Sequence, residues 1–221
     1  VALGMEPVEK DIMERPPKQH AKENEELNKI VKKLPEDEVV CREMLKLIHN
    51  EKVTVEKSKI EKTNTSLYLI MSNKILIGNM EENFTRIQTI AHECIHSIQD
   101  LKKLKLHFYF SNFYQIFFIL SIILAFFVKE AFWEWMIIGL LLLASIMLYV
   151  LRYPLEKDAM TRARDLASTY FEKSKLEKQE REEILKEYDQ INQIGIPIYQ
   201  TYLILNLMIK MGIIIIIYWI C

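Results

Sequence analysis

The sequence predicts an α+β membrane protein, in which a small polar domain of helices and a short sheet is joined to three transmembrane helices. Hydrophobic residues make up 50% of the 221 residues, but most of them fall into three long runs. The rest of the chain is rich in charge, and residues 52–78 contain short β-type runs separated by turn residues.

The three apolar runs predict the membrane spans. Residues 108–128 carry no charge, residues 131–151 carry only Glu134, and the third run covers residues 198–220. Each has about the twenty residues that a helix needs to cross the hydrocarbon, and the polar remainder is too small to bury them as a soluble core. Lys210 near the middle of the third run is expected to snorkel or to face a bundle interior rather than to act as a functional cation.

Flanking cations predict the orientation of these spans. Most of them border the first two spans at the ends away from the connecting turn: Lys102, Lys103, Lys105, Arg152, Lys157, Arg162 and Arg164, against Lys129 in the turn. The positive-inside rule therefore places the polar regions in the cytoplasm and the C-terminus outside. The first hundred residues contain no apolar run long enough for a secretory signal. We expect an integral membrane protein, with the lipid bilayer as its surroundings.

The composition divides the chain into five segments. Residues 1–21 are a flexible lead, and the four residues before Met5 resemble a remnant of cloning. The other segments are a helix/sheet domain (22–104), a transmembrane hairpin (105–152), a cytoplasmic helical segment (153–195) and the third transmembrane helix (196–221). The three cysteines, Cys41, Cys94 and Cys221, form no even framework, so no disulfide is needed.

Within the helix/sheet domain, amphipathic helices are expected over residues 23–34 and 38–49. Short strands are expected over residues 52–56, 66–71 and 75–78, as a small antiparallel sheet. The last strand leads into the next helix, so its edge could pair with a substrate backbone. A plain edge strand without a ligand is the alternative.

His92-Glu93-Cys94-Ile95-His96 is the most informative stretch of the chain. Two imidazoles four residues apart on a helix share a face and can both ligate one zinc ion, while Glu93 can take a proton from a water at the open metal position. The alternative is a pair of ordinary helix-face histidines. Cys94 is two residues from either histidine and is expected in the core.

The residues around this motif predict a helix. Asn79 is the expected cap, with Glu82 three residues later. The apolar series that keeps helical spacing is Phe84, Ile87, Ala91, Cys94, Ile98 and Leu101.

A catalytic zinc site needs a third protein ligand, and Glu156 is the best candidate. Pro154 suits the first turn of a helix, and alanines at 159, 163 and 167 would let that helix approach closely. Asp158 is the fallback ligand, or an acceptor for a histidine N–H. Alternatively, Glu156 only complements the positive end of its helix. His20, His49 and His107 belong to no motif, and His49 is expected at a helix C-terminus.

These residues resemble a known family. The stretch from His92 to Asp100, followed by Pro154 to Ala159 with Arg162-Ala163, is similar to the YugP-type bacterial membrane zinc metallopeptidases, which pair an HExxHxxQ helix with a later E-F-D-A segment. It is more distantly similar to the HtpX-like membrane proteases. The resemblance implies His92, His96 and Glu156 as ligands and Glu93 as base. Ile95 and Lys157 depart from the family pattern, at positions of glycine and an aromatic residue.

The sequence therefore predicts a zinc-dependent endopeptidase of gluzincin-like plan, with a zincin-like domain at the cytoplasmic face. Glu93 is the expected general base, and Arg162 the expected donor to the oxyanion. Expected substrates are membrane-associated peptides or proteins. The alternative is a non-catalytic scaffold whose structural zinc has a fourth ligand, His49 or Asp158. No phosphate loop or basic aromatic patch indicates a nucleic-acid partner.

Overall fold

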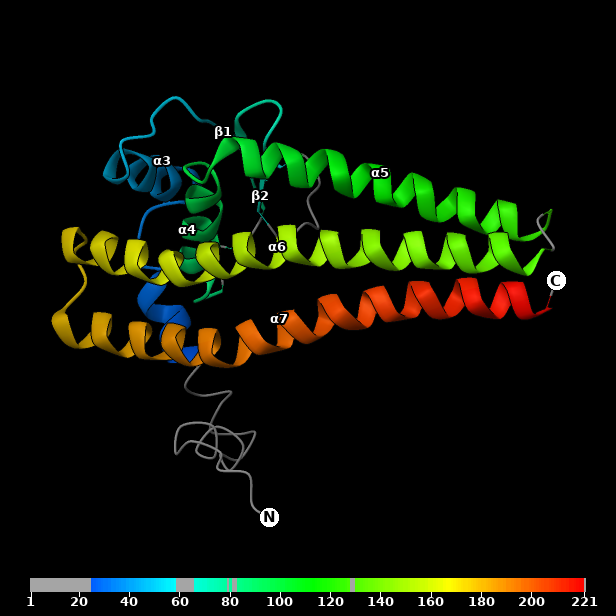
Figure 1. The fold of residues 1–221 in the computed structure, drawn as a ribbon. Helices are drawn as coiled ribbons and strands as arrows, with labels where there is room; N and C mark the ends of the chain where they lie inside the picture. Colours follow the sequence, from blue (N-terminus) through cyan, green and yellow to red (C-terminus); the bar gives the residue numbers. More distant parts are fainter. Residues whose placement is uncertain (1–24, 59–65, 79, 81–82, 128–129, 221) are drawn as a thin grey trace, which may run out of the picture. The chain divides into compact units, whose positions relative to one another are not determined.

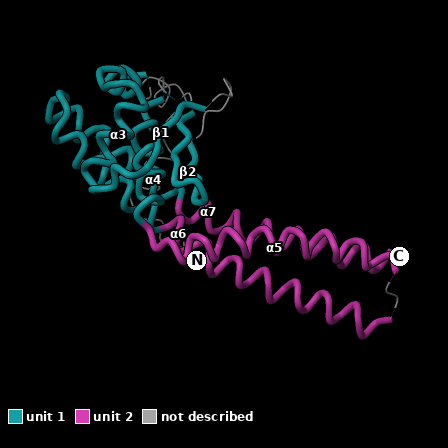
Figure 2. The backbone as a smooth tube through the Cα atoms, turned by 90° about the horizontal axis from the view of Figure 1, so that it is seen from above, with its two compact units in different colours: residues 1–98, 158–195 teal, residues 99–157, 196–221 magenta. Residues whose placement is uncertain are grey.

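The computed structural model describes residues 25–58, 66–78, 80, 83–127 and 130–220. The predicted lead over residues 1–21, the helix cap at Asn79 with Glu82, Lys129 and Cys221 lie outside the described residues. The chain divides into two compact units, which Figure 2 colours separately. The first unit comprises residues 1–98 and 158–195, and the second comprises residues 99–157 and 196–221.

The first unit contains a three-stranded sheet. Its strands are β1 (Thr54–Lys57), β2 (Leu67–Leu69) and β3 (Lys74–Ile77), in the order β1-β3-β2. β2 pairs with β3 antiparallel, but β1 pairs with β3 parallel, so the predicted all-antiparallel sheet is wrong in part. The stretch between β1 and β3 is long enough for the crossover that parallel pairing requires, and strand patterns alone did not reveal it.

The central strand of this sheet is β3. Ile75 and Ile77 are fully buried, and Ile75 lies between Val55 of β1 and Tyr68 of β2. This arrangement buries the apolar face of all three strands together. Both edges of β3 are paired, so the prediction that this strand offers an edge to a substrate is wrong, and so is its alternative of a plain edge strand. β2 is the edge strand in contact with the motif helix.

Helices of the first unit pack around the sheet. Residues 25–31 are helical, followed by α3 (Asp37–Leu47), and these confirm the two predicted amphipathic helices with shorter bounds. The motif helix is α4 (Arg86–His96). It begins at Arg86, so Phe84, which was expected on the helix, precedes it.

Two side chains explain why α4 begins at Arg86. The Asn83 Oδ1 atom accepts the N–H of Thr85 at 3.0 Å, which satisfies a donor at the helix start. The buried guanidinium of Arg86 pairs with Asp37 at 2.5 Å and donates to the Val31 carbonyl at 2.8 Å. Arg86 thus ties the start of α4 to both preceding helices.

The second unit consists of helical segments from α5 (Leu101–Ala125), α6 (Ala131–Lys173) and α7 (Lys178–Ile220), which run side by side in Figure 1. All three helices are long and apolar enough to cross a membrane, as predicted. Tyr114 and Ser145 join α5 to α6 through a 2.9 Å hydrogen bond between their hydroxyls. Gln200 of α7 donates to the Tyr149 hydroxyl of α6 at 3.0 Å.

Both α6 and α7 continue through a proline, Pro154 and Pro197 respectively. The predicted helix start at Pro154 is therefore wrong. An internal proline costs a helix roughly 3 kcal/mol because one backbone hydrogen bond is lost. The helix-forming residues on either side of Pro154 outweigh this cost. α6 passes without a break from the second unit, which ends at Lys157, into the first unit, which resumes at Asp158.

Candidate metal centre

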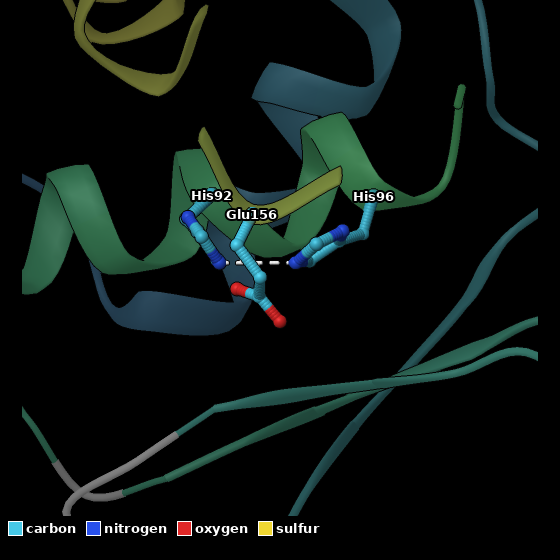
Figure 3. Close-up of side chains that lie close together, drawn as sticks. All are labelled: His92, His96 and Glu156. Atoms are coloured by element: carbon cyan, nitrogen blue, oxygen red, sulfur yellow. Dashed lines mark hydrogen bonds between the residues drawn. The ribbon is translucent and has the colours of Figure 1, made fainter. Parts of the chain in front are cut away.

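The two motif histidines meet on one face of α4. His92 and His96 are half-buried, and their Nε2 atoms are 3.0 Å apart. Their rings are almost perpendicular, with an interplanar angle of 89°. Figure 3 shows both Nε2 atoms turned toward each other, so the two imidazoles address one point beside the helix.

Glu156 completes a group of three potential metal ligands. One ligand atom from each of His92, His96 and Glu156 lies within 4.8 Å of the others, and Figure 3 shows the carboxylate beside the two rings. Glu156 lies on α6 two residues before Asp158, so the uninterrupted helix leads directly from it into the first unit.

The separation of the two nitrogens tests whether zinc fits. Two histidine nitrogens bound to a tetrahedral zinc at about 2.0–2.1 Å lie roughly 3.3 Å apart. The observed 3.0 Å differs from this by a few tenths of an ångström. A histidine pair with one carboxylate is also the donor set of several catalytic zinc sites. The residues present therefore fit a zinc ion.

Hydrogen bonds within the first unit connect α4 to α6 through α7. Gln88 of α4 donates to the Asn192 side chain at 2.8 Å, and Asn192 donates to the Met160 carbonyl of α6 at 3.1 Å. The predicted alanine stripe of α6 is fully buried at Ala159, Ala163 and Ala167. Small alanine side chains on this face of α6 allow neighbouring helices to pack closely against it, as the sequence indicated.

Gln99 holds the backbone next to Glu156. It lies three residues after His96, and its side-chain Nε2 donates to the Leu155 carbonyl at 2.7 Å. Gln99 is the glutamine of the HExxHxxQ pattern, which by itself indicated no role for it. Its spacing from His96 was the signal that could have found it.

The expected base, Glu93, is buried and anchored to the sheet. Its Oε2 atom accepts the backbone N–H of Tyr68 in β2 at 2.6 Å. Hydrogen bonds to a charged acceptor are short and strong, so this bond fixes the orientation of the carboxylate. The sequence did not reveal the role of Tyr68, because the donor is a backbone N–H and every residue except proline carries one.

Cys94 belongs to the core, as expected. It is fully buried, and its Sγ atom lies 3.8 Å from that of Cys41 in α3. Burial raises the pKa of the Cys94 thiol well above its usual value, and the contact with Cys41 adds to this effect. A neutral, buried thiol packs as a small apolar side chain.

The structure places Arg162 elsewhere than predicted. Its guanidinium is exposed and pairs with Asp158 at 3.4 Å, so the expected oxyanion role has no support from its position. At 3.6 residues per turn, Asp158 and Arg162 lie about 200° and 240° around α6 from Glu156. Both side chains therefore leave the helix on a different face from Glu156.

Neither proposed fourth ligand belongs to the metal-ligand group that the described residues form. His49 is exposed just after α3, in the left-handed backbone region with a φ of 55°. Three protein ligands leave a position for water, which is typical of catalytic rather than structural zinc.

The resemblance to YugP-type peptidases stays a prediction, and no protein-family model, curated protein or solved structure matches this chain.

Proposed function

We propose that this protein is a membrane-embedded zinc endopeptidase that hydrolyses membrane-associated peptides or proteins. The observation that carries the proposal is the convergence of His92 and His96 with Glu156, their ligand atoms within 4.8 Å. The sequence adds Glu93, directly after the first histidine. Zinc hydrolases commonly use three protein ligands together with a neighbouring carboxylate that acts as general base.

The chemistry requires a base in a fixed orientation. Zinc at this site would lower the pKa of a bound water toward about 7 and polarise the scissile carbonyl. Glu93 accepts the proton from the attacking water and returns it to the leaving amine. The N–H of Tyr68 keeps the Glu93 carboxylate in position before the substrate arrives. Gln99 holds the backbone beside Glu156, so that the third ligand is positioned as well.

The membrane setting indicates the class of substrate. Three helices of this chain are long and apolar enough to span a bilayer, and one of them carries Glu156. A site on a membrane-anchored chain favours substrates that are themselves membrane-bound or amphipathic. The distribution of lysine and arginine supports a cytoplasmic position for the proposed zincin-like domain. The membrane that we propose is a bacterial cytoplasmic membrane.

The test compares Glu93→Gln with wild type in detergent. Glutamine keeps the shape of glutamate but cannot accept the proton, so we expect cleavage of hydrophobic fluorogenic peptides to fall roughly a hundred- to ten-thousandfold with zinc content retained. Glu172→Gln, on an exposed face of α6, is the matched control. Wild-type cleavage by Glu93→Gln would refute the mechanism. A zinc-bound wild type that cleaves none of the peptides would favour the scaffold alternative.

A further inference from the structure

A polar cavity of about 210 Å³ lies among the helices of the second unit. Polar side chains from α5, α6 and α7 line it: Ser111, Gln115, Tyr149, Arg152, Asn206 and Lys210. Polar groups within apolar spans are expensive to bury, so those that line a cavity commonly mark a binding site.

Lys210 is the most unusual of these residues. It is about ten residues from either end of the third apolar run, or roughly 15 Å along the helix axis. Its ammonium group donates to the Gln115 side-chain oxygen at 3.1 Å and lies 4.8 Å from the ring centre of Tyr114. Both of these partners are electrically neutral. A lysine at mid-span is costly to keep within the hydrocarbon, and an anionic partner would offset that cost.

Arg152 brings a second positive charge to the cavity. Its guanidinium lies 5.9 Å from the ring centre of Tyr199, and its Nε atom is 3.7 Å from the Glu156 carboxylate. Arg152 and Glu156 are one helical turn apart on α6. The cavity therefore begins one turn from the third potential metal ligand. Among the described residues, the cavity lining includes two cations and no aspartate or glutamate.

Size and depth narrow the class of ligand. Cavities for small-molecule ligands usually measure about 300–1,000 Å³, so this one suits a single side chain or a chain terminus. Arg152 follows the second apolar run and so lies at the headgroup level, where a lipid phosphate can reach it. Lys210 lies deeper, near the middle of its span, beyond the level of lipid phosphates. A carboxylate carried by a hydrophobic peptide segment can reach that depth.

We propose that this cavity binds one carboxylate of the substrate's hydrophobic segment, with Lys210 as its main cationic partner. The proposal rests on the peptidase function above and specifies its substrates: apolar segments that carry an acidic side chain or a free C-terminus. Binding at Lys210 would hold such a segment beside α6 while its neighbouring backbone is presented for cleavage.

The experiment measures binding rather than cleavage. Full-length protein in micelles is titrated with a fluorescent leucine–alanine peptide that carries one central glutamate, and with the matched glutamine peptide. We expect wild type to bind the glutamate peptide about tenfold more tightly or better. Lys210→Met should abolish this preference and Lys210→Arg should keep it. Lys103→Met, which removes an exposed charge from α5, should also keep it. Circular dichroism and gel filtration establish that each variant is folded.

Three results would overturn the assignment: no preference in wild type, a preference that survives Lys210→Met, or equal displacement of both peptides by phosphatidylglycerol, which would identify a lipid site. Parallel cleavage assays separate the two proposals. Preference without cleavage supports the cavity and refutes the peptidase function. Cleavage without a preference for the glutamate peptide supports the peptidase function and refutes the assignment of the cavity.

Discussion

The backbone N–H of Tyr68 and the carboxylate of Glu93 form a 2.6 Å hydrogen bond between the edge strand β2 and the motif helix α4. The donor is an edge-strand amide and the acceptor is the expected base. The sheet thereby positions the base directly, without a second side chain.

Tyr68→Pro should slow peptide cleavage about ten- to a hundredfold and leave zinc content unchanged. Proline removes the N–H that Glu93 accepts, and a hydrogen bond to a charged group contributes roughly 1.5–3 kcal/mol. The Tyr68 N–H donates to Glu93 rather than to β3, so proline at this position breaks no hydrogen bond of the sheet. Steady-state kinetics and elemental analysis are the measurements. Tyr68→Ala removes the same buried side chain but keeps the N–H and serves as the control, so equal losses in both variants would refute the positioning role.

Zinc affinity should depend strongly on each of the three ligands and only weakly on Asp158. His92→Ala, His96→Ala and Glu156→Ala should each lose most of their bound zinc. Asp158→Ala should lose at most about tenfold in affinity, because Asp158 pairs with the exposed Arg162. Elemental analysis and competition with a chelator provide the affinities. Glu156→Ala with wild-type affinity would remove Glu156 from the site.

Gln99→Leu should weaken zinc binding about two- to tenfold. The variant loses the hydrogen bond to the Leu155 carbonyl, and a single neutral hydrogen bond contributes roughly 0.5–1.5 kcal/mol. Gln179→Leu replaces an exposed glutamine at the start of α7 and controls for the change in polarity. If the two variants bind zinc equally well, Gln99 does not position Glu156.

Burial of Cys94 predicts a specific dependence of stability on pH. The pKa of its thiol is raised in the folded protein, so the unfolded chain ionises first, near pH 8.5. The free energy of unfolding is then unaffected below that pH and falls as pH rises through it. Cys94→Ala should show a smaller alkaline loss in urea titrations between pH 7 and 10. Identical slopes in wild type and variant would contradict this.

Membrane topology can be read from thiol labelling of intact cells. Lys178 begins α7 with its side chain 82% exposed, so a cysteine there is accessible to a reagent on its own side. The positive-inside rule predicts that an impermeant reagent reaches Cys221 but not Lys178→Cys until the cells are permeabilised. Labelling of Lys178→Cys in intact cells would reverse the predicted orientation.

The sequence predicted the elements better than their connections. Three apolar runs predicted three long helices, and the spacing of His92 and His96 predicted their shared face, because both depend on local periodicity. The parallel pairing of β1 with β3 depends on the path of the chain between them, which periodicity does not encode. The late start of α4 follows from the buried contacts of Arg86 with distant carbonyls.

For the candidate site, the sequence revealed the potential metal ligands and the base, but not the backbone contacts that position them. Glu156 was found because a zinc motif lacked a ligand and an alanine stripe followed the candidate. Tyr68 acts through its backbone N–H, which any residue except proline would supply. Arg162 was assigned from its nearness in sequence to Glu156, and the helical angle between them defeats that inference.

Pro154 and Pro197 both lie within a few residues of the points where α6 and α7 leave one unit and enter the other. Each proline removes one backbone hydrogen bond of its helix, so bending at that turn requires less energy than elsewhere along either helix. Glu156 follows the first of these weakened turns by two residues. The third ligand is thus carried next to a turn of α6 whose backbone hydrogen bonding is incomplete.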